Sequence, residues 1–308
     1  MTDGVMVFAP TAMLTVTVES PADEVELHLH AGGQGVWQAR MIRSLGVPVT
    51  LCAAVGGEVG SVLRTLIEAE DVDLRLVNRD SGSGWYVDDR RSGDRNRIAE
   101  APGGPLGRHE LDELYGIALS AGLGAVVSVL SGPNDPSLVP DDMYRRLAAD
   151  LTEHGGRVVA DLSGSYVDAV LGGGVDFLKV SEEELVRDGR VGPGDEEALV
   201  RILRALRDRG AASVLISRAD QPALALLDGE LLTVHPPKLE EADHHGAGDS
   251  MTAGVAAVLA RGGDLREAVR TGAGAGALNV TRHGLGTGSA DAIAEVADRV
   301  TLSPREST

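Results

Sequence analysis

The stretch that decides the fold of this chain reads Asp243-His244-His245-Gly246-Ala247-Gly248-Asp249-Ser250 and leads into an apolar segment with helical periodicity. Small residues at the start of a helix let backbone N–H groups converge on an anion. Asp249 is then expected in the first helical turn, where it can accept a proton from an attacking hydroxyl while the N–H groups stabilise a transferred phosphoryl group. The alternative is an ordinary turn in which Asp249 caps the helix.

Outward from this stretch, short apolar runs alternate with amphipathic segments. Strands are predicted over residues 47–55, 125–130, 157–162, 175–180 and 213–217, and helices over 62–68, 111–119, 142–154, 195–209, 249–261 and 265–280. Residues 32–45 read as a glycine-rich turn that leads into a helix, and residues 223–235 as a hairpin. This alternation is typical of crossover units on a parallel sheet with helices on both faces. We therefore expect one α/β domain over residues 1–308.

Two segments depart from this rhythm. Residues 4–31 are β-rich, and residues 83–100 form a polar, glycine-punctuated hairpin with Arg90, Arg91, Arg95 and Arg97. Parallel sheets of this kind bind ligands at the carboxyl ends of their strands. We predict that residues of about 11–31 and 83–100 form a lid over that edge.

Composition excludes several classes of partner. The chain has 28 Lys plus Arg against 47 Asp plus Glu, a net charge of −19. Such a charge repels nucleic acid and anionic lipid surfaces. No apolar run approaches the ~20 residues of a membrane span, and the N-terminus has no basic region of a signal peptide. Cys52 is the single cysteine and lies in an apolar run, so we expect a buried thiol, no intrachain disulfide, and a cytoplasmic protein that acts on a small molecule.

Two motifs together resemble one known family. Gly246-Ala247-Gly248-Asp249-Ser250, followed by a helix of small residues, resembles the carboxyl-terminal signature of the ribokinase-like, PfkB-type carbohydrate kinases. Gly32-Gly33-Gln34-Gly35-Val36-Trp37-Gln38-Ala39 resembles the amino-terminal signature of that family. The similarity extends over roughly residues 5–300, and the Lys-x-Ser-x-x-Glu run that begins at Lys179 is similar to the 1-phosphofructokinase and tagatose-6-phosphate kinase branch.

This resemblance implies a ribokinase-like three-layer αβα sandwich with a mostly parallel central sheet and a small β-rich lid. The implied activity is ATP-dependent phosphorylation of a hydroxyl group on a small sugar, sugar phosphate or sugar-like molecule, with Mg²⁺. Relatives that dimerise through their lid strands make a homodimer an expectation as well.

The resemblance also implies roles for individual residues. Asp249 corresponds to the general base, and Gly246, Ala247 and Gly248 to the anion hole. Glu184 corresponds to the residue that organises Mg²⁺. The implied nucleotide contacts are Lys179, Ser181, Ser217, Gly248 and Asn279. The implied acceptor contacts are Met13, Gly32, Gly33, Gln34 and Trp37.

The acceptor end departs from the family pattern. Gln34 replaces a lysine and Trp37 an asparagine, Met13 replaces a sugar-holding aspartate, and the lid arginine aligns near Gly84. An amide offers hydrogen bonds without charge, whereas cations supply much of phosphate recognition. These changes weakly favour an acceptor without a phosphate, and an indole at position 37 could stack on a sugar face or a flat ring. A sugar-phosphate site rebuilt from the arginines of the hairpin stays open.

The nucleotide end departs too. Ser181 replaces an asparagine, and Ala219 and Pro222 replace glycines. These changes leave open a catalytically weak or inactive ligand-binding protein, and Trp37 leaves open a nucleoside kinase. Three further features carry less weight. His28 and His30 share a strand face but have no visible third metal ligand, so we expect a solvated or lid-facing pair. His244 and His245 precede the anion hole and could tune it, although the family has small residues there with no fixed role, and the small residues from Gly272 onward are expected to permit close helix packing.

Overall fold

The computed structural model describes residues 4–20, 24–240, 245–281 and 286–305. Asp243 and His244 of the carboxyl-terminal signature lie outside these residues.

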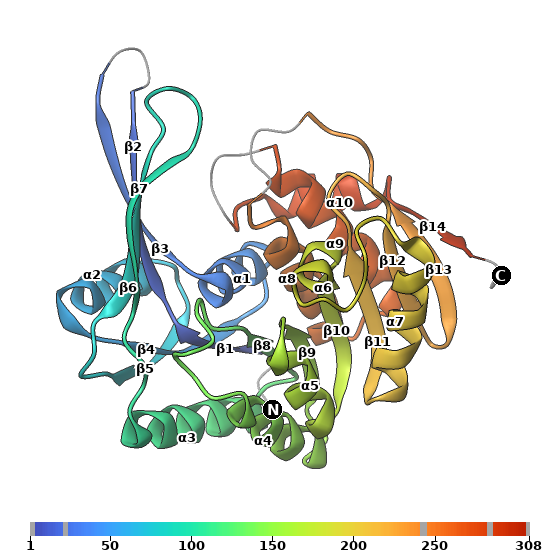
Figure 1. Cartoon of the computed structure of the whole chain (residues 1–308), viewed down its shortest axis with the longest axis horizontal. Coiled ribbons are helices and arrows are strands. Elements are labelled where there is room, and N and C mark those ends of the chain that lie inside the picture. Colours follow the sequence, from blue (N-terminus) through green and yellow to red (C-terminus); the bar gives the residue numbers. More distant parts are fainter. Residues whose placement is uncertain (1–3, 21–23, 241–244, 282–285, 306–308) are drawn as a thin grey trace.

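A large, mostly parallel sheet forms the centre of the molecule (Figure 1). Its strand order is β14-β13-β12-β11-β10-β9-β8-β1-β4-β5. The parallel strands are β1 Val5–Thr11, β4 Val49–Val55, β5 Asp73–Asn78, β8 Val127–Ser131, β9 Arg157–Asp161, β10 Val175–Ser181 and β11 Ala211–Ser217. The antiparallel strands at one edge are β12 Ala223–Leu227, β13 Glu230–His235 and β14 Thr301–Pro304.

Helices cover both faces of this sheet. One layer consists of α1 Gln34–Ser44, α2 Gly57–Glu68, α8 Ala247–Ala260, α9 Leu265–Asn279 and α10 Ala290–Ala297. The opposite layer consists of α3 Arg108–Gly124, α4 Asp142–Glu153, α5 Ser165–Gly173, α6 Glu182–Arg187 and α7 Glu196–Asp208. The predicted three-layer αβα sandwich is confirmed.

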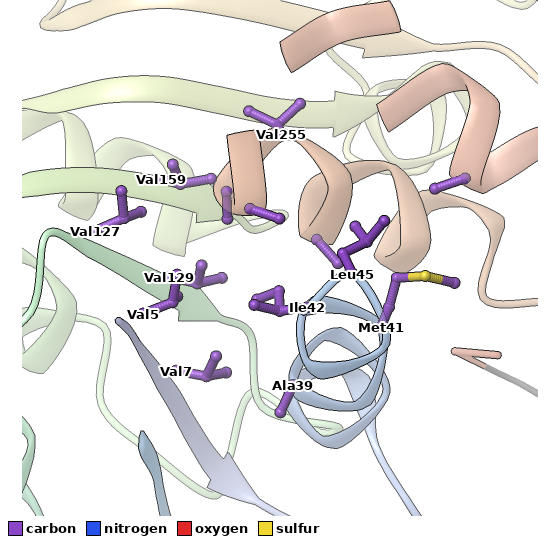
Figure 2. Close-up of a cluster of buried hydrophobic side chains, with 14 of the residues drawn as sticks. Val5, Val7, Ala39, Met41, Ile42, Leu45, Val127, Val129, Val159 and Val255 are labelled. Carbon is purple, nitrogen blue, oxygen red and sulfur yellow. The ribbon is translucent and has the colours of Figure 1, made fainter. Parts of the chain in front are cut away.

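The alternation of apolar side chains between the two faces of each strand produces two cores, one on each side of the large sheet. In β1, Val5 and Val7 belong to the first core, whereas Met6 and Phe8 belong to the second, because successive side chains of a strand point to opposite faces. Figure 2 shows the first core, in which Ile42 and its neighbours on α1 pack beside the valines of the sheet and α8. Both cores are mostly aliphatic, in keeping with the low aromatic content of 3%, with Phe177 in the first core and Phe8, Tyr144 and Tyr166 in the second.

A second, four-stranded sheet has the order β3-β2-β6-β7 and projects from the body (Figure 1). Its strands are β2 Met13–Glu19, β3 Glu26–Gly32, β6 Ser83–Asp89 and β7 Asn96–Gly103. These strands come from the two segments that the sequence sets apart. β2 pairs in parallel with β6, and the outer pairs are antiparallel. Leu14, Val16 and Trp85 on one face pack against the first core at the base of this small sheet.

The small residues of α8 and α9 permit the close helix packing that the sequence predicts. A Cβ on Gly254 would lie 2.7 Å from the Cα of Gly272, and a Cβ on Gly272 would lie 2.6 Å from the carbonyl oxygen of Met251. Cys52 is buried, also as predicted, and burial raises the pKa of its thiol to about 12. Among the described residues, none of the helices combines the length and apolar character that a bilayer crossing needs.

Several elements are absent from the prediction. They are β5, α5, α6, α10 and β14. β5 is a largely exposed edge strand, so its apolar pattern is weak, and β14 spans only Thr301–Pro304. The helix predicted over 62–68 begins earlier, at Gly57. Each of these differences involves a short or exposed element, where periodicity carries little signal.

Candidate active site

A cavity of about 1710 Å³ lies at the carboxyl edge of the large sheet. The ends of β9, β10 and β11 and the N-terminus of α8 line it. Register explains why residues distant in sequence meet here, because Lys179 pairs with Asp161 and Ser181 with Ser217 on neighbouring strands. The cavity brings together the following residues that the sequence singles out: Gln34, Lys179, Ser181, Glu184, Ser217, Gly246, Ala247, Gly248 and Asp249.

The N-terminus of α8 opens into this cavity. Gly246 precedes the helix with φ 74°, a left-handed conformation that favours glycine. A Cβ on Gly276 of α9 would lie 2.9 Å from the carbonyl oxygen of Ala247, so α9 packs close behind the first turn. The first N–H groups of a helix have no acceptor within it. Those of α8 are therefore available to an anion in the cavity.

Asp249 stands in the first turn of α8, as expected, and its side chain contacts Gln34 through a hydrogen bond. Burial and the nearby carboxylate of Asp161 raise the pKa of Asp249 to about 8, although the Lys179 ammonium opposes the shift. A carboxylate with a pKa near neutrality is suited to accept and return a proton.

Lys179 connects this turn to the sheet. Its Nζ donates to Oδ1 of Asp161 at 3.1 Å, and a Cβ on Gly248 would lie 2.5 Å from the same Nζ. The ammonium therefore lies directly against the backbone of the predicted anion hole. Burial alone would lower the pKa of Lys179, but the carboxylates of Asp161, Glu184 and Asp249 raise it, which keeps the side chain charged.

Asp161, at the end of β9, is the centre of a buried polar network that sequence reasoning missed. It is fully buried and accepts hydrogen bonds from Gln38 Nε2 at 3.0 Å and Thr252 Oγ1 at 2.8 Å, besides the one from Lys179. Ser131 in turn donates to the Oε1 of Gln38. Burial raises the pKa of Asp161, and the Lys179 charge opposes this rise. The signal available in the sequence is a single acidic residue that ends an apolar strand.

Ser181 and Glu184 form a reciprocal cap at the start of α6. The Glu184 N–H donates to Ser181 Oγ at 3.1 Å, and the Ser181 N–H donates to Glu184 Oε2 at 2.8 Å. Glu184 also lines the cavity. Among the described residues, no group of three or more His, Cys, Asp and Glu side chains could hold a metal by itself. Glu184 places one carboxylate at the cavity, and proteins commonly bind Mg²⁺ through one or two carboxylates together with substrate phosphates.

The predicted acceptor residues are only partly brought together. Gln34 accepts a hydrogen bond from the Gly132 N–H at 2.8 Å and lines the cavity. Met13, Gly32, Gly33 and Trp37 are not among the residues that line it. Gly33 precedes α1 with φ 97°, and a Cβ on Gly32 would touch the ring of Trp37 at 3.4 Å.

Asn279 lies behind the cavity. It is fully buried, and its Nδ2 donates to the carbonyl oxygen of His245 at 2.7 Å, while its Oδ1 accepts from Ser250 Oγ and Gly286 N–H, each at 3.2 Å. These contacts link the end of α9 to the turn before α8. Asn279 is not among the residues that line the cavity, and its role as a nucleotide contact stays a prediction.

Comparison with known proteins decides the family. A model described as pfkB family carbohydrate kinase matches residues 5–292. The chain belongs to this family. The PfkB chain is 29% identical over 260 residues to ATP-dependent 6-phosphofructokinase isozyme 2 of Escherichia coli K12, covering 82% of each chain. It is 26% identical over 258 residues to 1-phosphofructokinase of Bacillus subtilis, covering 84% of each.

Solved structures agree on the fold. Phosphofructokinase-2 from Escherichia coli superposes with a TM-score of 0.85 at 24% identity, over 97% of this chain and 99% of that one. The fold is ribokinase-like, as the resemblance implies, with a large mostly parallel sheet and a smaller one. As a PfkB protein the chain is a carbohydrate kinase, an enzyme that transfers a phosphoryl group to an alcohol of a sugar.

Proposed function

We propose that this PfkB protein uses Mg-ATP to phosphorylate a hydroxyl group of a small sugar, sugar phosphate or sugar-like molecule, with Asp249 as general base. One observation carries the proposal: a carboxylate whose pKa is raised to about 8 lies in the first turn of α8, beside the ammonium of Lys179 and in the wall of a large cavity. The first N–H groups of α8, the Lys179 ammonium and the Asp249 carboxylate, as proton acceptor, thus lie close together in the wall of the cavity. A kinase that uses ATP needs a compartment that supplies it, so we also propose that the protein acts in the cytoplasm.

In the proposed reaction, Asp249 accepts the proton of the acceptor hydroxyl as that oxygen attacks the γ-phosphorus. The bond between the γ-phosphorus and the oxygen that bridges it to the β-phosphate breaks, and ADP leaves. The N–H groups of Gly246, Ala247 and Gly248 stabilise the charge of the transferred group, and Lys179 adds a fixed positive charge beside them. Glu184 would hold Mg²⁺, which neutralises phosphate charge when bound. Proton transfer to Asp249 is worth about 10²–10⁴-fold in rate.

The nucleotide is proposed to lie against the ends of β10 and β11, where Ser181 and Ser217 line the cavity. Because Asn279 ties His245 to α9, we assign it the support of the anion hole from behind. The two sides of the cavity then correspond to the two reactants, with Gln34 and Asp249 between them.

The small sheet is proposed to be the lid over the acceptor. Its arginines are already paired with carboxylates: Arg91 with Asp89, Arg97 with Asp88 and Glu100, Arg95 with Asp88, and Arg90 with Glu19. These pairs favour an acceptor that does not need a phosphate site on the hairpin. The two relatives named above are both phosphofructokinases, which keeps sugar phosphates as the main competing class of acceptor.

A homodimer through the small sheet is part of the proposal. Large apolar side chains on its two edge strands β3 and β7, and just before β3, are exposed, namely Val25 (68%), Leu27 (64%), Leu29 (42%) and Ile98 (57%). Such a patch is typical of an interaction surface. Light scattering after size exclusion should give a dimer for the parent and a monomer for Leu27→Asp, and a monomeric parent would contradict this point.

The test of function is ADP release from Mg-ATP over a panel of sugars, sugar phosphates, polyols and nucleosides, with Asp249→Asn beside the parent. We expect turnover with one sugar class and its loss in the variant. A nucleoside as the preferred acceptor would contradict the sugar assignment. No turnover together with no effect of ATP on the melting temperature would favour an inactive ligand-binding protein.

A further inference from the structure

The loop between β11 and β12, residues 218–222, contains no glycine and borders the proposed nucleotide end of the cavity. Pro222, at its far end, has a fixed φ and no N–H group. At its near end, Arg218 directly follows the last residue of β11. The side chain of Arg218 is only 6% exposed, so its charge depends on protein partners.

Two carboxylates supply those partners. Nε of Arg218 donates to Glu182 Oε2 at 2.8 Å, and Nη1 donates to Glu196 Oε2 at 2.7 Å. Glu182 is the first residue of α6 and Glu196 the first of α7. One guanidinium therefore joins the loop to the starts of two helices. Arg305, which follows β14, donates to the other oxygen of Glu196 and extends the connection to the antiparallel edge.

The Glu182 carboxylate also fixes the wall of the cavity. Glu182 Oε1 accepts from the Gly194 N–H at 3.1 Å, and both residues line the cavity. Glu182 is two positions before Glu184, the residue proposed to hold Mg²⁺. A guanidinium presents its donors in a rigid plane, so two simultaneous pairs define the distance between the loop and α6 more closely than a flexible ammonium would.

We infer that Arg218 is a positioning residue for the nucleotide. Its ion pairs with Glu182 and Glu196 hold the 218–222 loop and the start of α6 at a set separation, so that the nucleotide meets a preformed wall. A preformed wall removes the ordering cost that a mobile loop adds to binding. This inference rests on the proposed function. It assigns Arg218 to the nucleotide side only, because Gln34 and Asp249, which lie between the two sides, share no hydrogen bond or ion pair with Arg218, Glu182 or Glu196.

The experiment measures the dissociation constant of ADP in the presence of Mg²⁺ by calorimetry, and the KM values for ATP and for the acceptor. Removing both ion pairs in Arg218→Ala should weaken ADP binding about tenfold and raise the KM for ATP similarly, with the acceptor KM unchanged. Arg218→Lys should restore part of the affinity, because an ammonium can bond one carboxylate. Glu196→Gln should show a smaller effect in the same direction, although Glu196 does not line the cavity.

Arg266→Ala is the matched control. It breaks the exposed pair between Arg266 and Glu230, and neither residue lines the cavity. We expect it to leave ADP binding unchanged.

Three outcomes would overturn the inference. The first is unchanged ADP affinity in folded Arg218→Ala and Glu196→Gln; if Arg218→Ala does not fold, Glu196→Gln decides alone. The second is an equal rise in the KM values for ATP and acceptor, which would indicate a general structural role. The third is a parent protein that binds no ADP at all. That result would contradict the proposed function itself. It differs from a failure of the inference about Arg218 alone, in which the parent binds ADP and the variants bind it equally well.

Discussion

The raised pKa of Asp249 suits its proposed role as general base, but it lowers the stability of the folded protein at high pH. Burial and the Asp161 carboxylate raise its pKa from 3.8 to about 8 in the folded protein. Folding therefore disfavours the ionised form. The folded state loses stability as the pH rises from the unfolded pKa through the folded one, and the loss is absent below about pH 4.

The variant Asp249→Asn removes this pH-dependent loss. We expect it to melt at a higher temperature than the parent at about pH 8, with a gap that narrows as the pH falls towards 4; about 1 kcal/mol corresponds to ~2 °C in a chain of this size. Thermal unfolding across this pH range measures the gap. A variant less stable than the parent at pH 8, or a gap independent of pH, would contradict the burial of an ionisable base.

Gly248 leaves room for the Lys179 ammonium. A Cβ in Gly248→Ala would come within 2.5 Å of Nζ, so the lysine must leave its place beside Asp161. We expect a fall in kcat of about tenfold or more with the fold retained. Gly116→Ala in α3 is the control, because its Cβ meets nothing within 4 Å and should stabilise the helix by about 0.5–1 kcal/mol. Equal activity in the two variants would rule out a tight Lys179 site.

Residue roles could be predicted only where a local motif carries them. Gly246 to Asp249 are contiguous, so their shared turn follows from the sequence itself. Asp161 has no such motif, since its partners Gln38 and Thr252 are 123 and 91 positions away. Their meeting depends on the strand order and on the packing of α1 and α8, which composition and periodicity do not encode.

Among the helices, α8 and α9 show how packing places chemistry. The proposed anion hole is at the start of α8, and the packing of this helix on α9 depends on the close contact at Gly272. Gly272→Ala would bring a Cβ within 2.6 Å of the Met251 carbonyl oxygen and force the helices apart. We expect a loss of about 1–3 kcal/mol in the free energy of unfolding, as for other overpacked sites.

Urea denaturation gives this loss, and kcat gives the accompanying displacement of the anion hole. Gly116→Ala again serves as the control, since it adds the same methyl group to an open helix position. An unfolding free energy for Gly272→Ala equal to that of the parent would disprove the close contact.

At the same scale, the sequence predicts long periodic elements well and marginal ones poorly. The helix predicted over 142–154 and the strand over 157–162 agree with α4 and β9 to within a residue or two. α5 was missed because it is short and ends in glycines, and β14 because it adds to an edge after the main pattern has ended. The small sheet could be anticipated as a β-rich departure, whereas the parallel pairing of β2 with β6 could not, because it joins two separate hairpins.

The whole molecule carries a net charge of −19, which destabilises a compact state by self-repulsion. Raising NaCl from about 10 mM to 150 mM shortens the Debye length from ~30 to ~8 Å. We therefore expect the melting temperature to rise with salt over this range. Differential scanning calorimetry in NaCl, with an equal osmolality of sucrose as control, measures the rise. A melting temperature that falls on adding NaCl would show that favourable ion pairs outweigh the repulsion.

The small sheet is made from two excursions of the chain, one between β1 and α1 and the other between β5 and α3. Neither excursion supplies a strand to the large sheet. Substitutions in the excursions can therefore accumulate without disturbing Asp161, Lys179 or the start of α8. The small sheet, which is the proposed lid over the acceptor, can thus change in sequence while the residues proposed for phosphoryl transfer keep their places. Selection can then alter which acceptor such a kinase takes without altering the transfer step.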